Sequence, residues 1–367
     1  MVATKIICMG GKILFMFKNR DIPASPEKIL VIRSGAIGDV LMSTPLLLVL
    51  KKKYPKAEIC YLVGKWSSNA LKNNPNVDKI IEFDDELIYK KILSKVIKLI
   101  KQIRKEKFDL CFILDKSWLW GLFTWLCNIK FKIGFDRNGE GFAYNISIPF
   151  DGSKYELEYN LELARKIRIK DMDRKIKIYC NKKDAVNARE FLNRIKGKLF
   201  IGIAPGGAIN PGQNFLAKRW PEERYEELIK KILKNYGNCC ILLFGGSDDE
   251  KLLENLKNRI NSKKILVAPL GSIQTTYLLM NKCKVIVAHD SGAMHIAGAS
   301  NSRVIALFGP TPSNRFSPEN SIVLETKSKE CPCYDIYGNY DRNCGKECMK
   351  NIAVDKVFYK ISRVFKK

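Results

Sequence analysis

Residues 284–311 read KVIVAHDSGAMHIAGASNSRVIALFGPT. The run at 285–288 is apolar and rich in β-branched side chains, which predicts a buried parallel strand. The small side chains that follow Gly292 predict a helix that packs closely on a sheet, and the apolar run at 303–308 predicts the next strand. The stretch therefore predicts strand, turn, helix and strand in an α/β fold with parallel strands.

The turn of this stretch, Asp290-Ser291-Gly292, has the composition of an anion site. A helix that starts at the carboxyl end of a parallel strand directs free N–H groups and a positive dipole end toward the crevice, and phosphate is the usual occupant. The alternative is a plain strand–helix–strand unit without a ligand. His289 and His295 are the only histidines of the chain, and we expect His295 to support the structure of the turn rather than to catalyse.

Composition favours an anionic partner. The 367 residues, enough for two domains, include 64 Lys and Arg against 38 Asp and Glu, a net charge of +26. Such an excess suits a phosphorylated small molecule, an anionic membrane face or nucleic acid. Lysine is spread over nearly every expected helix and no nucleic-acid-binding signature accompanies it, so nucleic acid is the least favoured partner.

No run of eighteen apolar residues occurs, so no membrane-spanning helix is expected. Residues 1–27 lack a small-residue cleavage site after their apolar middle, and we interpret them as an N-terminal extension rather than a signal peptide.

The first domain is expected over residues 28–172. A strand at 28–33, a turn that contains Gly38 and Asp39, an apolar helix at 40–54 and a strand at 58–64 form its first strand–helix–strand unit. The turn lacks the third glycine of a dinucleotide fingerprint. The pattern continues with strands at 77–83 and 108–115 and a basic amphipathic helix at 87–105.

The segment after the strand at 108–115 is rich in aromatic residues. Trp118 and Trp120 lie there among lysines, a composition that suits a lipid interface or a lipid-acceptor site. The alternative is a helix buried against the sheet. Asp171-Met172-Asp173 has the spacing of a metal-binding DxD triplet, but its polar surroundings favour a linker.

The second domain is expected over residues 173–350. Its strands end in Gly, Ser, Asp or Lys, so that polar groups collect along one edge of the sheet, where open α/β sheets bind ligands. Gly206 lies in the turn after the strand at 199–204, and Lys218 and Arg219 precede a helix start marked by Pro221.

Two such domains that face each other enclose a cleft. One wall offers an anion site at Lys218, Ser291 and Gly292, and the other offers a lone carboxylate, Asp39. This pairing suits transfer of a group away from a phosphate leaving group. The carboxylate removes a proton from an incoming hydroxyl, and the anion site stabilises the departing diphosphate.

The chain resembles glycosyltransferase family 9, the ADP-heptose:lipopolysaccharide heptosyltransferases. Four stretches carry the resemblance, in the family's order and spacing between residues 28 and 311: ILVIRSGAIGDVLMSTPLLLVLKKKYPKAEICYLVG, IGIAPGG with KRWPEERYEELI, ILLFGGSDDE, and VIVAHDSGAMHIAGASNSRVIALFGPT. The resemblance implies a GT-B fold, two Rossmann-like domains that face each other across a cleft, and an inverting reaction that needs no metal or other cofactor.

The resemblance also implies roles for individual residues. Asp39 is the expected general base, and Lys218 the contact to the donor phosphates. Asp290 contacts the transferred sugar, and Ser291 and Gly292 lie at the phosphates. The remaining expected site residues are Gly206, Asp249 and Glu250 on the donor side, with one of the two acids at the ribose or adenine, and Gly38, Arg33, Trp118 and Trp120 on the acceptor side. The loop at 210–214 lacks the paired threonines that some members of the family place at the donor phosphates. This departure concerns the identity of the donor.

The implied reaction moves a heptose from ADP-heptose to the inner core of lipopolysaccharide, an anionic lipid-linked glycan. The implied location is cytoplasmic and peripheral, on the inner face of the inner membrane. Two alternatives stay open: a family 9 transferase for another sugar or glycan, and a non-catalytic basic peripheral membrane protein that binds nucleotide sugars.

The tail of the chain holds a cysteine cluster: Cys331, Cys333, Cys344 and Cys348. The spacing differs from the paired C-x2-C of most zinc knuckles, yet four cysteines so close together form a candidate structural zinc site, and a reducing compartment disfavours disulfides. Residues 351–367 are expected to form a helix that returns to the first domain.

Overall fold

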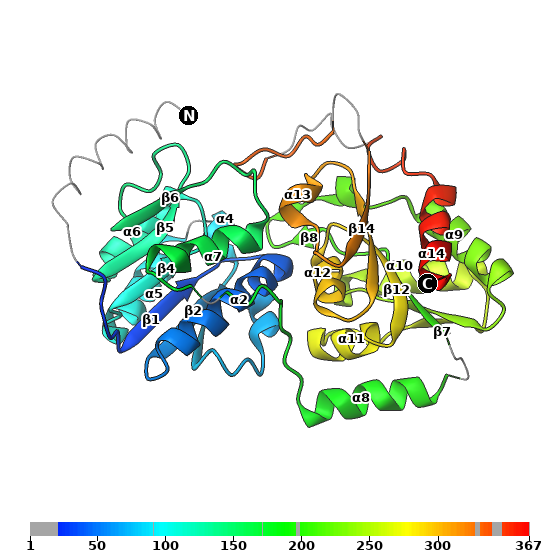
Figure 1. Ribbon diagram of the computed structural model, residues 1–367, viewed down its shortest axis with the longest axis horizontal. Helices are drawn as coiled ribbons and strands as arrows, with labels where there is room; N and C mark the ends of the chain where they lie inside the picture. The colour runs from blue at the N-terminus through cyan, green and yellow to red at the C-terminus, as the bar shows by residue number, and fades with distance from the viewer. Residues whose placement is uncertain are drawn as a thin grey trace. The chain divides into compact units, whose positions relative to one another are not determined.

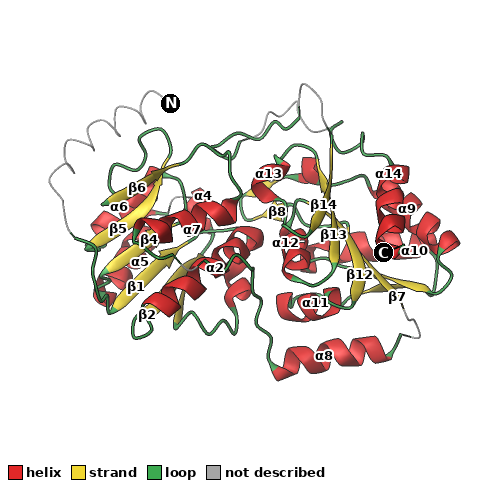
Figure 2. Cartoon of the chain, viewed as in Figure 1, coloured by secondary structure: helices red, strands yellow, loops and turns green. Residues whose placement is uncertain are grey.

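The computed structural model describes residues 21–90, 92–170, 172–195, 199–326, 331–339 and 347–366. The chain divides into two units, residues 1–176 and 177–367, a few residues after the boundary expected from the sequence. Within each unit a parallel sheet is flanked by helices (Figure 1, Figure 2). Among the residues described, no helix has the length and apolar character needed to cross a membrane.

The first unit contains a six-stranded sheet with the order β3-β2-β1-β4-β5-β6, and every pair of neighbours is parallel. This is the strand order of the Rossmann fold, in which the order reverses between β1 and β4. The strands are β1 (Lys28–Ile32), β2 (Glu58–Gly64), β3 (Lys79–Phe83), β4 (Leu110–Ile113), β5 (Phe131–Asp136) and β6 (Ile146–Pro149). The helices are α2 (Ile37–Lys53), α3 (Lys65–Ser68), η1 (Asn69–Leu71), α4 (Glu86–Lys90), α5 (Leu93–Glu106), α6 (Trp118–Leu126) and α7 (Glu156–Lys166).

Helices α5 and α6 bury their apolar sides against this sheet. Leu99 and Ile103 of α5 and Phe123 of α6 belong to one core cluster with side chains of β1, β2, β3 and β4. Helix α2 packs beside α7, and its Ser43 shares a buried hydrogen bond of 2.7 Å with Tyr61 of β2. The sheet is thus covered by apolar helix faces, as the continuous apolar strands require.

The second unit repeats the topology. Its parallel sheet has the order β11-β10-β7-β12-β13-β14, which reverses between β7 and β12. The strands are β7 (Leu199–Ala204), β10 (Cys239–Leu243), β11 (Ile265–Val267), β12 (Cys283–His289), β13 (Arg303–Phe308) and β14 (Ser321–Glu325), and β8 (Ile209–Asn210) pairs with β9 (Gln213–Asn214) as a small hairpin. The helices are α8 (Lys182–Asn193), η2 (Leu216–Lys218), α9 (Glu222–Asn235), η3 (Ser247–Asp249), α10 (Glu250–Ile260), α11 (Ile273–Met280), α12 (Gly292–Ala299), α13 (Ser313–Phe316) and α14 (Val354–Phe365).

The C-terminal helix α14 belongs to the second unit, so the expectation that it returns to the first domain is wrong. It lies beside α9 (Figure 1), and Val357 and Ile361 are buried in the second unit's core cluster. Trp220 donates a hydrogen bond of 3.0 Å to the Ile352 carbonyl just before the helix. The apolar stripe of α14 thus finds its partner on the sheet and helix of its own unit.

Candidate active site

The reversal point of the first sheet gathers charged side chains from the ends of β1 and β4. Asp39 lies in the first turn of α2, directly after the buried Gly38, and Arg33 follows β1. Arg33 Nη2 lies 2.7 Å from Asp39 Oδ2, and its Nη1 lies 3.0 Å from the Leu114 carbonyl and 3.5 Å from Asp115 Oδ1. The guanidinium therefore holds Asp39 on one side and the end of β4 on the other.

Asp115 is a structural carboxylate that the sequence did not single out. It accepts hydrogen bonds of 2.7 Å from the Ser34 amide and 3.0 Å from the Ser34 hydroxyl. Burial raises its pKa, and the nearby Arg33 only partly opposes this. With these bonds, Asp115 fixes the loop that leads from β1 into α2, and with it the position of Asp39.

A second buried ion pair lies in the same unit. Lys116 Nζ is 2.5 Å from Glu156 Oε2, with both side chains at most 10% exposed, and it lies over the rings of Phe135 and Phe150. Burial lowers the pKa of Lys116, although Glu156 opposes that change. Asp39 also acts electrostatically on Lys116, and Glu156 on Arg33, so the two ion pairs form one charged group.

The two tryptophans expected on the acceptor side have different settings. Trp120 contacts Phe83 and Phe123, with ring centroids 6.0 and 5.4 Å apart, and packs against the core cluster of the unit. Trp118 begins α6 and is partly exposed. Trp120 is partly exposed as well, so the structure shows aromatic contacts for Trp120 without separating the two tryptophans by exposure.

In the second unit, the reversal point lies between the ends of β7 and β12. Lys218 Nζ donates a hydrogen bond of 2.9 Å to Asp290 Oδ2, and the two side chains are 16% and 7% exposed. Burial raises the pKa of Asp290, but Lys218 and His295 together outweigh it and bring the pKa below its usual value. Asp290 is therefore an anion with a fixed cation beside it.

Helix α12 starts at Gly292, directly after this pair. Ser291 is its N-cap residue, and the Ser291 hydroxyl donates to the His289 carbonyl at 3.1 Å instead of capping the helix. Gly292 is partly exposed. The positive end of the helix dipole and the Lys218 ammonium thus occupy the same place, as a binding site for a diphosphate requires.

The glycine turn after β7 is held by Asp249 and Arg219. Asp249 accepts hydrogen bonds of 2.9 Å from the amides of Gly207 and Gly246 and from Arg219 Nη2, while Arg219 Nε donates to the Gly207 carbonyl at 2.8 Å. A Cβ atom on Gly206 would lie 2.2 Å from Asp249 Cγ. Asp249 thus positions the turn with both of its oxygens.

Of the two acids expected at the ribose or adenine, Glu250 is the exposed one, at the start of α10.

His289 is completely buried, with Nδ1 3.2 Å from the Tyr225 hydroxyl. Burial lowers its pKa to about 3, with a further contribution from Arg219. His295 Nε2 lies 3.9 Å from Asp290 Oδ1, which agrees with a supporting role. The loop at 210–214 forms the hairpin of β8 and β9.

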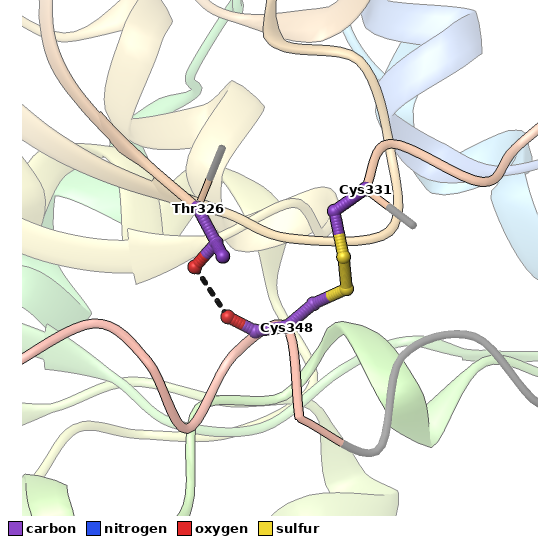
Figure 3. Close-up of a disulfide and its surroundings, with 3 residues drawn as sticks. All are labelled: Thr326, Cys331 and Cys348. Atoms are coloured by element: carbon purple, nitrogen blue, oxygen red, sulfur yellow. Dashed lines mark hydrogen bonds between the residues drawn. A yellow bond between two sulfur atoms is a disulfide. The ribbon is translucent and has the colours of Figure 1, made fainter. Parts of the chain in front are cut away.

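The cysteine tail differs from the expected zinc site. Cys331 and Cys348 form a disulfide, and Figure 3 shows it beside the hydrogen bond that Thr326 Oγ1 donates to the Cys348 carbonyl. Cys344 lies outside the described residues. Among those described, no group of three or more His, Cys, Asp or Glu side chains is placed to hold a metal ion. Because Cys331, Cys333 and Cys348 are all disulfide-bonded, the structure does not support the zinc site.

Two Rossmann-like units, each with its polar residues at the point where the strand order reverses, make up a fold of the GT-B class. The family model described as glycosyltransferase family 9 (heptosyltransferase) matches residues 96–338. The chain belongs to this family, and the protein is a glycosyltransferase.

Individual known proteins agree with this assignment. The lipopolysaccharide heptosyltransferase 2 of Salmonella typhimurium is 26% identical over 307 residues, which cover 79% of this chain and 85% of that protein. The family 9 glycosyl transferase of Veillonella parvula matches with a TM-score of 0.75 at 20% identity, over 94% of this chain and 98% of that one. The E. coli ADP-heptose lps heptosyltransferase II matches with a TM-score of 0.71 at 22% identity, over 92% and 98%.

Proposed function

We propose that this protein transfers a heptose from ADP-heptose to the inner core of lipopolysaccharide, with inversion at the anomeric carbon and without a metal. The observation that carries the proposal is the buried Lys218–Asp290 pair at the start of α12, in a chain of family 9. A cation and a helix N-terminus at one point suit a diphosphate. Relatives named as lipopolysaccharide heptosyltransferases support the choice of sugar and acceptor.

In the proposed step, the acceptor hydroxyl loses its proton to Asp39 while its oxygen forms a bond to the anomeric carbon of the heptose. The bond from that carbon to the diphosphate oxygen breaks, and ADP leaves with the electron pair. A single displacement of this kind inverts the anomeric configuration. Arg33, 2.7 Å from one oxygen of Asp39, fixes the carboxylate so that the other oxygen receives the proton.

The second unit would stabilise the leaving group. An ammonium carries three N–H donors, so Lys218 can hold Asp290 and a phosphate oxygen at once. Gly292 starts α12 there, and we assign its amide to the other phosphate. Asp290 would contact a hydroxyl of the transferred sugar, and Glu250 the ribose. Charge that develops on the diphosphate would then meet donors that are already in place.

Helix α5 supports a location on an anionic membrane surface. Leu93 and Ile97 are 70% and 44% exposed, and they share the exposed face of the helix with four basic residues: Lys98, Lys101, Arg104 and Lys105. An exposed helix face that combines apolar and basic side chains suits an interface with anionic lipid. We assign this face to the cytoplasmic side of the inner membrane, where the lipid-linked acceptor would be met.

A transfer assay tests the proposal. The purified protein is incubated with ADP-heptose and a lipid A–Kdo acceptor or its heptosylated product, in EDTA, and the products are followed by mass spectrometry and by NMR of the new anomeric centre. We expect addition of one heptose with inverted configuration and no transfer from UDP- or GDP-sugars. Equal or faster transfer of another sugar, retention of configuration, or loss of activity in EDTA would overturn the corresponding part of the proposal.

A further inference from the structure

The segment that follows β14 lies against the donor half of the site. The amides of Cys333 and Tyr334 both donate to the Pro310 carbonyl, at 2.9 and 3.1 Å, and Pro310 follows β13. The neighbouring Thr311 and Lys218 line one hollow together with Tyr334. The tail of the chain therefore supplies a wall of the place where the Lys218 ammonium lies.

Three aromatic rings surround that ammonium. Lys218 Nζ lies 5.0 Å from the ring centroid of Phe215, 5.5 Å from that of Tyr334 and 6.0 Å from that of Phe316. The Tyr334 ring also makes edge contacts with the other two, at centroid separations of 6.3 Å to Phe215 and 5.9 Å to Phe316. Asp290 approaches Lys218 Nζ at 2.9 Å, so the cation is held by one carboxylate and three rings.

The Tyr334 ring is also held by Arg315 and by the turn that follows it. Arg315, itself buried, lies with its Cζ 5.6 Å from the Tyr334 ring centroid, and its Nη1 donates to the Asp335 carbonyl at 3.4 Å. Asp335 in turn accepts hydrogen bonds of 2.8 Å from the amides of Tyr337 and Asn339. The turn after Tyr334 is thus closed by hydrogen bonds, and it holds the ring in place.

The Cys331–Cys348 disulfide anchors the same segment (Figure 3). Cys348 and Met349 pack against Gly309, where a Cβ atom would lie 3.0 Å from Cys348 Cβ and 2.7 Å from Met349 Sδ. The segment that carries Tyr334 is therefore attached at Pro310 by hydrogen bonds and next to Gly309 through the disulfide.

We propose that Tyr334 is a positioning residue of the donor site, which holds the Lys218 ammonium where it meets the donor diphosphate. A cation over an aromatic face is attracted by the ring, more strongly where water is excluded. Without the Tyr334 ring, Lys218 keeps Asp290, Phe215 and Phe316 but is less ordered before the donor binds, and the ordering that is still required weakens binding. This inference rests on the proposed role of Lys218 as the contact to the diphosphate.

The test compares Tyr334→Leu with Tyr334→Phe, which keeps the ring and loses only the hydroxyl. For Tyr334→Leu we expect the Kd for ADP and the KM for the donor to rise about 5- to 30-fold, the range that a partly buried cation–ring contact supplies. Because Lys218 is also proposed to meet the charge that develops on the leaving diphosphate, kcat is expected to fall as well, while the KM for the acceptor stays within about twofold. Tyr334→Phe is expected to bind ADP as the wild type does.

A double-mutant cycle separates positioning from general disruption. In a Lys218→Met background, Tyr334→Leu is expected to change the Kd for ADP less than twofold, because the group it positions is gone. An equal loss in both backgrounds, or wild-type ADP affinity in Tyr334→Leu, would overturn the inference. If Lys218→Met alone left ADP binding unchanged, the proposed role of Lys218 would fail instead, whatever the Tyr334 variants did.

Discussion

The Lys218–Asp290 pair places two opposite charges in the interior of the second unit, where each depends on the other. Burial acts against the charged form of Asp290, and the ammonium of Lys218 reverses that effect. Neutralising only one partner would leave an unpaired buried charge, which typically costs about 3–5 kcal/mol. The Lys218 ammonium is therefore held by an ion pair only while Asp290 stays ionised.

The buried His289 makes a separate contribution at the same strand end. Its pKa is lowered to about 3, first by burial and then by Arg219. An unfolded histidine takes up a proton near pH 6.5. His289 therefore stabilises the fold fully above about pH 6.5, and this contribution is lost progressively as the pH falls toward 3.

We predict that His289→Gln lowers the pH dependence of stability on the acid side of neutrality. Between about pH 6 and 4 the free energy of unfolding of the wild type should fall by up to about 1.4 kcal/mol per pH unit more than that of the variant. The reason is that unfolding of the wild type lets His289 take up a proton in this range, whereas glutamine takes up none. Urea unfolding at half-unit pH intervals measures the two slopes. Parallel curves would show that His289 does not titrate in this way, whatever the absolute stability of the variant.

At the scale of elements, the glycine turn after β7 depends on a close approach of backbone and carboxylate. Gly206→Ala would bring a methyl group to 2.2 Å from Asp249 Cγ, and Asp249 cannot move without losing its bonds to Gly207, Gly246 and Arg219. We expect a destabilisation of at least about 2 kcal/mol and weaker ADP binding. Thermal unfolding and calorimetric titration measure the two effects.

Gly237→Ala is the matched control, since nothing lies within 4 Å of the added Cβ atom. It should unfold at the wild-type temperature and bind ADP normally. A Gly206→Ala variant that behaved like Gly237→Ala would contradict the described packing of the turn.

Helix α5 gives a prediction about the membrane. Lys98→Gln/Lys101→Gln should weaken binding to phosphatidylglycerol vesicles about 30-fold, because each basic residue near an anionic surface contributes about 1 kcal/mol. Lys182→Gln/Lys183→Gln removes the same charge from the exposed start of α8 and should bind like the wild type. Vesicle flotation compares the two. Equal losses in both variants would point to net charge alone and argue against the α5 face.

Elements with a strong local pattern were predictable. The buried strands β1, β7, β12 and β13 lie where apolar runs indicated them. The helix expected at 87–105 is instead divided into α4 and α5, because Ile92 has an extended backbone with ψ 101°. Strands β5 and β6 were not predicted, since β5 follows the aromatic helix α6 closely and its signal merges with that segment.

The site was predictable only as separate motifs. Asp39 and the Asp290 turn each lie in a motif that can be recognised from the sequence. Asp115 and Tyr334, which support the site, lie far along the chain from those motifs, and no local sequence pattern connects them to the site. Asp115 reaches the Ser34 loop through the pairing of β1 with β4. Tyr334 reaches Lys218 through the Pro310 carbonyl. Strand order and tail packing are long-range properties, and a sequence pattern indicates only that strands exist.

At the scale of the whole molecule, both units use the same strand order for different tasks. In each sheet the order reverses next to the strand that comes first in the chain, between β1 and β4 in the first unit and between β7 and β12 in the second. The polar residues lie at these two points. The first unit contributes a carboxylate, Asp39, and the second a cation, Lys218. The packing of α14 on α9 could not be predicted, because its apolar stripe would suit either unit equally well.

In the proposed reaction the two units divide the work: Asp39 serves the chemical step, and the second unit binds the donor. The measurement is kcat for heptosyl transfer together with the Kd for ADP, in Asp39→Asn and in the control Asp21→Asn, which alters an exposed residue of the first unit. We predict a fall in kcat of about 10²- to 10⁴-fold for Asp39→Asn, with the Kd for ADP unchanged and Asp21→Asn like the wild type. Wild-type turnover in Asp39→Asn, or a loss of ADP binding that accounts for its inactivity, would contradict this division of roles.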